Sequence, residues 1–191
     1  MIKLSPNNIE KILTALKNGA VLVCPTDTVY GLVCDASNEK AIERIFLMKQ
    51  RDKLKPLAIF VKDIEMAEEY AEISMEQEEK LQKSWPGAVT FILKAKQIED
   101  GLLSLLVYKN NTIGMRVPKY DLLRKILKEF NRPLAQTSAN ISGVPATGKI
   151  GEVINQFTKE DVIIVDAGDL PIRSPSTIID LTNNKVNILR K

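Results

Sequence analysis

The spacing of apolar residues divides the chain into segments of two kinds. In the first kind they recur every three or four residues, as on one face of an amphipathic helix. Ser5 and Pro6 precede the first such segment and Gly19 follows it, and these residue types are common start and stop signals of helices. The predicted helices lie between Pro6 and Gly19, at 38–49, twice within the acidic stretch 64–83, and at 120–130 and 152–157.

The second kind of segment is a short apolar run rich in β-branched residues, which predicts a strand buried in a sheet. These runs lie between the predicted helices without a fixed repeat, so the sequence predicts an α/β fold with a mixed sheet. The predicted strands are 20–24, 57–61, the run that follows the Pro86–Gly87 turn, 112–118, 134–137, 162–165, 176–181 and 185–189.

The composition is that of one soluble domain. The chain has 191 residues, of which 45% are hydrophobic and 27% charged, so we expect a single domain over residues 1–191. A net charge of +3 permits contact with nucleic acid but is below that of a dedicated binder. We find neither an apolar run long enough to cross a bilayer nor a signal peptide in residues 1–11. We therefore expect a cytoplasmic protein with no membrane partner.

Histidine is absent from the sequence, which excludes a Ser-His-Asp triad, a Cys-His pair and a histidine zinc site. The two cysteines, Cys24 and Cys34, are too few for a four-thiolate site. Both lie in or after apolar runs, where a free cysteine usually packs as a small buried hydrophobe. We expect no metal ligands among the side chains, no organic cofactor and no covalent nucleophile.

Four cations alternate with other residues after the second predicted helix: Lys49, Arg51, Lys53 and Lys55. In an extended segment they would share one face and could neutralise a polyphosphate while donating hydrogen bonds to its oxygens. The alternative is that they end the helix, where cations suit the negative end of the helix dipole and stay solvated.

The sequence PTDTVYGL, which begins at Pro25, contains two threonines that can face the same way from the end of a strand. Strand ends in α/β sheets often form a binding crevice, and Gly31 would allow a ligand or another backbone to approach closely. The alternative is a strand end followed by a turn, since Pro, Thr, Asp and Gly are all common in turns.

A run of small polar residues, TSANISGVPATG, follows the predicted strand 134–137. Such a loop can present backbone N–H groups and short side chains to an anion or a nucleobase. It has neither the G-K-[ST] of a Walker A loop nor the GxGxxG of a dinucleotide site. A plain surface loop is the alternative. Its polar and glycine residues are Thr137, Ser138, Asn140, Ser142, Gly143, Thr147 and Gly148.

Together these stretches resemble the YrdC family of threonylcarbamoyl-AMP synthases. Each motif is short, but seven of them occur in the family's order over nearly the whole chain. The matching motifs are PTDTVYGL, K-x-R at Lys49 and Arg51, PL at Pro56–Leu57, WPGAVTFIL, MRVP, TSANISG and STIID.

The resemblance implies a single α/β domain with a large twisted mixed sheet, flanking helices and a deep basic cavity. It implies an enzyme that joins L-threonine, bicarbonate and ATP into threonylcarbamoyl-adenylate and releases pyrophosphate, with Mg²⁺ on the phosphates. A partner enzyme would then transfer the threonylcarbamoyl group to the adenosine next to the anticodon of a tRNA. A weak contact of this chain with RNA or tRNA is also expected.

The same resemblance assigns residues to two subsites. Lys49 and Arg51 are the expected catalytic residues. The expected ATP-binding residues are Lys49, Arg51, Lys53, Thr112, Ser138, Asn140, Ala146 and Arg190. The expected threonine-binding residues are Thr26, Arg116, Gln136 and Ser176, with Arg116 facing the carboxylate.

The chain departs from the family pattern at three places. Many members have proline at the position of Asp52 and histidine at the position of Phe60, and the usual C-terminal LRxG is shortened after Arg190. Two other functions are compatible with the motifs: an RNA-binding module of the same fold without ATP turnover, and a paralogue that acts on another acceptor. The low aromatic content of 5% disfavours the RNA-binding module, because single strands stack on aromatic side chains.

Overall fold

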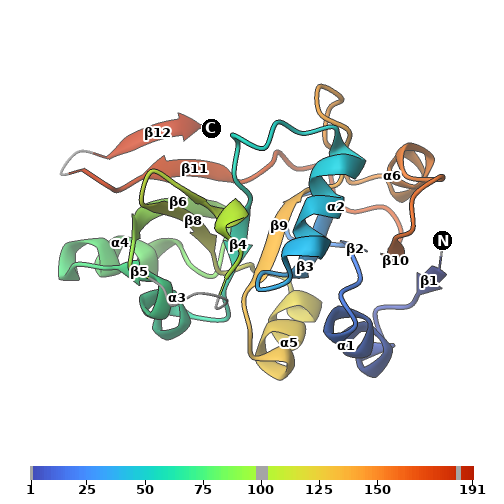
Figure 1. Ribbon diagram of the computed structural model, residues 1–191, viewed down its shortest axis with the longest axis horizontal. Helices are drawn as coiled ribbons and strands as arrows, with labels where there is room; N and C mark the ends of the chain where they lie inside the picture. The colour runs from blue at the N-terminus through green and yellow to red at the C-terminus, as the bar shows by residue number, and fades with distance from the viewer. Residues whose placement is uncertain (1, 98–102, 184–185) are drawn as a thin grey trace.

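A computed structural model describes residues 2–97, 103–183 and 186–191, and its strands join in one mixed sheet (Figure 1). The strand order is β1-β10-β2-β3-β9-β4-β8-β6-β11-β12, with β5 paired to β6 and β7 to β8. The strands are β1 (Ile2–Leu4), β2 (Leu22–Cys24), β3 (Gly31–Asp35), β4 (Ala58–Phe60), β5 (Ala71–Glu72), β6 (Val89–Ala95), β7 (Tyr108–Lys109), β8 (Thr112–Arg116), β9 (Leu134–Ser138), β10 (Ile163–Val165), β11 (Thr177–Asp180) and β12 (Asn187–Arg190).

At the start of two helices, side chains accept hydrogen bonds from backbone N–H groups that have no partner within the helix. Asn38 accepts a hydrogen bond from Ala41 N at the start of α2, and Ser74 and Gln77 form a capping box at the start of α4. The helices are α1 (Ile9–Lys17), α2 (Glu39–Lys49), α3 (Ile64–Tyr70), α4 (Met75–Ser84), α5 (Asp121–Phe130), α6 (Ile150–Gln156) and the 3₁₀ helix η1 (Leu105–Val107).

The two faces of the sheet are covered by different helices. Successive side chains of a strand point to opposite faces, so each strand contributes to both layers. Leu32 and Cys34 of β3 pack with α2, α3, α4 and α6, whereas Val33 packs with α1 and α5. Figure 1 shows α1 and α5 side by side under one half of the sheet. Different helices therefore cover the two faces, and α1 and α5 cover only part of the second face.

The uncovered part of the second face carries the polar residues of the central strands. Ala58 and Phe60 of β4 lie on this face, opposite Gln136 of β9 and Arg116 of β8 in the sheet register. Thr90 of β6 continues the same face beside β11. Side chains alternate between the two faces along these strands. Because Ile59 and Met115 point into the core, the next residues along the strands, among them Arg116, lie on the face that no helix covers here.

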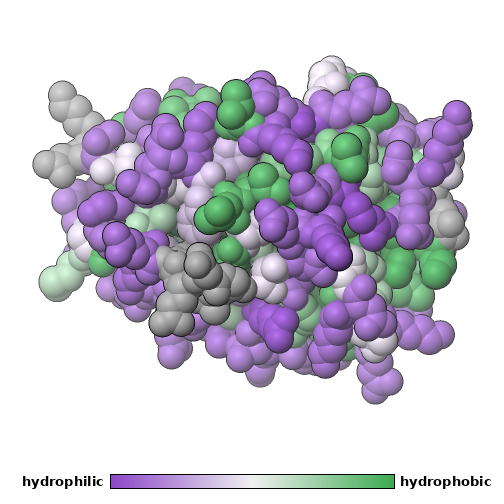
Figure 2. All heavy atoms as spheres, viewed as in Figure 1, coloured by the Kyte–Doolittle hydropathy of each residue, from purple (hydrophilic) through white to green (hydrophobic). Residues whose placement is uncertain are grey.

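Figure 2 shows the face of the molecule that is seen in Figure 1. In the view of Figure 2 hydrophilic residues predominate, and hydrophobic residues gather near the middle, over η1. Leu105 of η1 is 78% exposed. No helix in the described residues is long and apolar enough to cross a membrane.

The predicted α/β fold with a mixed sheet is confirmed, and each predicted helix occurs within a few residues of its expected position. The sequence analysis assigned no strand to β1, β3, β5 or β7. The predicted strand 185–189 begins later, as β12 at Asn187, and Lys185 itself lies outside the described residues.

The packing of α5 gives a test of this fold. Leu127 is fully buried between α5, α1 and the sheet, and truncation to alanine should lower the free energy of unfolding by about 2–5 kcal/mol. The neighbouring Lys128 is exposed, so Lys128→Ala should change it by less than about 0.5 kcal/mol. Urea unfolding of both variants measures the difference, and equal costs would contradict this placement of α5.

Candidate active site

A cavity opens on the uncovered part of the sheet, between β3 and β11. It is basic, because three arginines face it and no carboxylate in the described residues lines it. The basic cavity implied by the family resemblance is therefore present. Its lining residues are Thr26, Thr28, Val29, Tyr30, Gly31, Arg51, Pro56, Ala58, Phe60, Thr90, Arg116, Gln136, Thr137, Ser138, Pro175, Ser176, Ile178 and Arg190.

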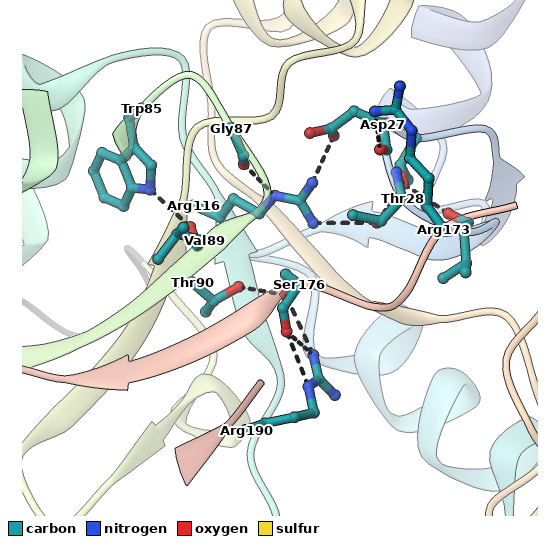
Figure 3. Close-up of polar contacts among 12 residues, drawn as sticks. Asp27, Thr28, Trp85, Gly87, Val89, Thr90, Arg116, Arg173, Ser176 and Arg190 are labelled. Carbon is teal, nitrogen blue, oxygen red and sulfur yellow. Dashed lines mark hydrogen bonds and ion pairs between the residues drawn. The ribbon is translucent and has the colours of Figure 1, made fainter. Parts of the chain in front are cut away.

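Arg116, the last residue of β8, is buried in the cavity wall with 2% of its surface exposed. Its guanidinium donates to Gly87 O at 2.8 Å, to Asp27 Oδ1 at 2.6 Å and to Thr28 Oγ1 at 3.4 Å (Figure 3). It also lies 5.7 Å from the centre of the Phe60 ring. The aspartate compensates the buried charge, and the other contacts fix the orientation of the group.

Thr26 and Thr28 lie in the segment between β2 and β3, and their side chains face each other. Thr26 Oγ1 donates to Val29 O at 2.6 Å, accepts from Thr28 N at 3.0 Å and lies 2.9 Å from Thr28 Oγ1. These bonds fix the turn that leads into Gly31. A Cβ atom on Gly31 would lie 3.3 Å from Thr137 O, so a glycine suits this close approach of β3 to β9.

Ser176 links β6 to β12 at the opposite wall of the cavity. Its hydroxyl lies 2.9 Å from Thr90 Oγ1, and its carbonyl oxygen accepts two bonds from Arg190, at 2.9 and 2.7 Å (Figure 3). Arg190 Nη2 is also 3.2 Å from Ser176 Oγ. Arg190 therefore lies against the cavity, although it is the next-to-last residue of the chain.

Lys49 ends α2 and reaches the loop that follows β9. Its Nζ donates to Ser138 O and Asn140 O, both at 2.6 Å, and to Asn140 Oδ1 at 3.2 Å. Ser142 N donates to Lys49 O at 2.8 Å. Burial lowers the pKa of Lys49 to about 7, and nearby Arg51 adds to the shift. The lysine is therefore a buried cation held by oxygen atoms of the Ser-Ala-Asn loop.

Arg51 stands between two hollows. It lines the main cavity, and together with Lys49, Lys55, Ser138 and Asn140 it also lines a second one. Its Nε donates to Lys55 O at 2.9 Å and its Nη2 to Pro56 O at 3.2 Å. The guanidinium is thus held at the boundary where an elongated anion could contact both hollows.

The three arginines of the cavity disfavour one another's charges. Burial lowers the pKa of Arg51, Asp52 opposes that shift, and Arg190 adds a smaller lowering. The pKa of Arg190 is lowered by burial and by Arg116. Burial also lowers the pKa of Arg116, and Asp27 opposes that shift. Within this row only Arg116 forms an ion pair among the described residues. An anionic ligand would relieve the repulsion at the other two.

Most of the expected site residues line the main cavity or the second hollow. Lys49 and Asn140 line the second hollow, which shares Ser138 with the main cavity. The expected residues that line one of the two hollows are Thr26, Lys49, Arg51, Arg116, Gln136, Ser138, Asn140, Ser176 and Arg190.

Three expected residues do not line either hollow. Lys53 forms an exposed ion pair with Glu43 at 2.9 Å, and Ala146 lies in the loop before α6 without a contact to the cavity. Thr112 starts β8, four residues from Arg116 on the same strand face, and its hydroxyl donates to Lys109 O.

Of the two interpretations of the four cations, the shared extended face is wrong, and the one in which they end a helix holds for Lys49. An extended strand would place all four on one face, but Lys49 is the last residue of α2 and Gln50 adopts a left-handed conformation with φ of 50°. Lys55 N then donates to Asp52 O in a turn. The chain therefore directs Lys49 inward and Lys53 outward.

Two residues that contact Arg116 were missed by the sequence analysis. Asp27 belongs to the motif that supplied Thr26 and Thr28, and a lone carboxylate in a neutral polar motif was an available signal. Gly87 acts through its backbone carbonyl, which no side-chain pattern reveals.

The described residues contain no group of three or more histidine, cysteine or acidic side chains placed to hold a metal ion.

The sequence of this chain is similar to those of known proteins. The family profile Sua5_yciO_yrdC, described as "Telomere recombination", matches residues 14–191. The threonylcarbamoyl-AMP synthase of Photobacterium profundum is 30% identical over 94% of this chain and 97% of its own length. That of Pseudoalteromonas translucida is 34% identical over 94% of this chain and 96% of its own length.

Solved structures share the fold over the same range. Pyrococcus abyssi Sua5 in complex with L-threonine superposes with a TM-score of 0.89 at 31% identity, over 99% of this chain. This chain spans 56% of that longer protein. Escherichia coli YciO superposes with a TM-score of 0.87 at 26% identity, over 100% of this chain and 93% of its own.

The buried Lys49 predicts a pH dependence of stability. Between about pH 7 and pH 10.5 the unfolded chain keeps a proton on Lys49 that the folded chain has lost, so stability rises with pH in this window. Below pH 7 the cost of the buried charge is fully present. In Lys49→Met this contribution is absent, so the free energy of unfolding of the native chain should rise relative to the variant across the window. Urea unfolding of both proteins at several pH values measures it, and a constant difference would contradict the lowered pKa.

Proposed function

The chain belongs to the Sua5/YciO/YrdC family, and on that premise we propose that it is a threonylcarbamoyl-AMP synthase. It joins L-threonine, bicarbonate and ATP into threonylcarbamoyl-adenylate and releases pyrophosphate. Residues 1–191 act as one domain, and the product passes to a tRNA-modifying transferase in the cytoplasm. The relatives named as this synthase, together with the geometry of the cavity, support the proposal.

The observation that supports this function best is that a single cavity holds two kinds of cationic position, one paired with a carboxylate and one without such a partner among the described residues. Arg116 is already paired with Asp27 and presents a fixed guanidinium of low net charge, which suits the single carboxylate of an amino acid. Arg51 and Arg190 form no ion pair among the described residues, so their guanidiniums can pair with phosphates. The amino acid and the nucleotide therefore lie next to each other.

The amino-acid subsite consists of the residues around Arg116. Arg116 binds the carboxylate, and Thr26, Gln136 and Ser176 surround the rest of the molecule. Phe60 supplies an apolar face under the guanidinium instead of a polar contact. Threonine would then be oriented chiefly by its carboxylate and by the hydroxyl-bearing walls.

The nucleotide subsite extends from Arg51 toward the Ser-Ala-Asn loop. Arg51 and Arg190 contact phosphate oxygens, with Ser138 beside them. Lys49 acts from behind: it holds Ser138 and Asn140 in place and adds positive potential. Lys53, Thr112 and Ala146 can contribute only to parts of ATP that extend beyond the two hollows, which makes them its peripheral contacts.

The reaction suits a site without histidine. Bicarbonate loses water to give carbon dioxide, and carbon dioxide and the threonine amine give a carbamate with release of a proton. The carbamate oxygen attacks the α-phosphorus of ATP, and pyrophosphate leaves. Such a transfer depends on holding the reactants together and on neutralising charge, and both tasks can be met by fixed arginines and backbone groups. Mg²⁺ would enter with ATP and neutralise phosphate charge.

Omission of single substrates tests the proposed function. Purified protein with ATP, Mg²⁺, bicarbonate and L-threonine should release pyrophosphate, and removal of threonine or bicarbonate should abolish the release. Release that does not need threonine would indicate a paralogue with another acceptor. No release, with salt-sensitive RNA binding instead, would indicate an RNA-binding module.

The role of Arg51 has a matched control on the preceding helix. Arg51→Ala removes a charged contact to phosphate, worth roughly 1.5–3 kcal/mol, so kcat/KM for ATP should fall about tenfold to a hundredfold. Arg44 on α2 pairs with the exposed Asp161, outside both hollows, so Arg44→Ala should leave kcat/KM within about twofold. Steady-state pyrophosphate release measures both. Equal losses in the two variants would contradict the phosphate subsite at Arg51.

A further inference from the structure

The contacts of Arg116 come from two segments that are distant in the sequence. Asp27 and Thr28 belong to the connection between β2 and β3, and Gly87 to the turn before β6. Figure 3 shows these groups arranged on different sides of the guanidinium. Its orientation therefore depends on residues that do not themselves line the cavity: neither Asp27 nor Gly87 is part of its lining.

Two N–H groups of Arg116 have no partner among the described residues. A guanidinium has five N–H groups. The Nε–H bonds to Gly87 O, one N–H of Nη1 to Thr28 Oγ1, and one N–H of Nη2 to Asp27 Oδ1. One N–H on each terminal nitrogen is therefore available to a ligand, and an N–H of a guanidinium forms a strong charge-assisted bond to a carboxylate oxygen.

Gly87 cannot be replaced without moving its carbonyl. Its N–H donates to Val117 O at 2.9 Å, next to Arg116. A Cβ atom at this position would lie 2.3 Å from Ser84 O, which is a backbone atom that cannot rotate away. Any side chain here therefore shifts the turn, and with it the acceptor of the Nε–H bond.

Asp27 is itself fixed from the other side. Arg173 Nη1 donates to Asp27 O at 3.0 Å, and the Asp27 carboxylate is 5% exposed. This arrangement leaves the carboxylate little freedom other than its bond to Arg116. The Asp27 carboxylate also offsets most of the charge of the Arg116 guanidinium. A ligand with a single carboxylate therefore suits Arg116 better than a polyphosphate does.

We propose that Asp27 and Gly87 are positioning residues of the amino-acid subsite, which hold Arg116 with its two remaining N–H donors toward the carboxylate of bound threonine. This inference rests on the proposed function. It assigns a role to the turn of the WPGAVTFIL motif, which is otherwise outside the cavity. It also explains why the subsite would discriminate an amino acid from its amide, since only a carboxylate accepts both donors and carries the charge.

Binding measurements on three variants test the proposal. Asp27→Asn and Gly87→Ala should each raise the Kd of L-threonine by about tenfold to a hundredfold, because small displacements of a positioned group have effects of that size. The Kd of ATP should change by less than about twofold. The preference for L-threonine over L-threoninamide should also fall in both variants. Isothermal titration calorimetry measures each quantity.

Asp35→Asn is the matched control. Asp35 is a buried aspartate of β3 that pairs with Arg132 at 3.2 Å, and it lies at the end of the strand away from Gly31. Loss of the Asp35–Arg132 ion pair should lower the free energy of unfolding and leave the Kd of L-threonine unchanged. If Asp27→Asn does not fold, Gly87→Ala still tests the proposal, because it leaves the ion pair in place.

The outcomes separate this inference from the proposed function. Native protein that binds no L-threonine contradicts both. Native binding with an unchanged Kd in Asp27→Asn and Gly87→Ala contradicts the positioning role alone, as does an equal loss in Asp35→Asn. Hydrogen exchange of the Arg116 Nε–H, observed by NMR without ligand, should be faster in both variants than in the native chain and in Asp35→Asn. Unchanged protection would also overturn the proposal.

Discussion

Lys49 and Arg116 are cations with 2% of their surface exposed, and the site depends on the oxygen atoms that the fold supplies to them. A buried charge is costly unless it is paired or hydrogen-bonded. Lys49 is satisfied by two backbone carbonyls and the Asn140 side chain, and Arg116 by a carboxylate and a carbonyl. Because these acceptors lie in loops or, for Ser138, at the end of β9, the bonds to the cations also fix the segments that form the cavity.

The partial covering of one sheet face determines where the cavity with its buried cations can form. The helices α1 and α5 cover the half of the face around β2 and β3, and the remaining half is left to side chains such as Thr90 and Gln136. Three guanidiniums then face one space, and only one of them has a carboxylate partner in the described residues. Under the proposed function, a bound amino acid and a nucleotide would relieve the repulsion among them. The same argument explains how the chain would promote adenylation without histidine.

Local sequence signals were sufficient for the helices and for most strands, because apolar periodicity reports burial directly. They failed for β3, whose residues Gly31–Asp35 follow a turn motif and are buried on both faces, so they show no alternation. They also failed for the cations after α2, since the left-handed Gln50 and the turn at Asp52 break the extended geometry. The family motifs located the cavity residues, whereas Asp27 and Gly87 could not be connected to Arg116 without the tertiary structure. Their contacts span 89 and 29 residues of sequence.

The central claim is that one cavity binds an amino-acid carboxylate at Arg116 and nucleotide phosphates at Arg51. A crystal structure of the chain with L-threonine and a non-hydrolysable ATP analogue tests it most directly. The account predicts the threonine carboxylate on the two free N–H groups of Arg116, with Asp27 unmoved, and the phosphates between Arg51 and Ser138. Threonine bound at Arg51, or a nucleotide bound outside this cavity, would contradict it.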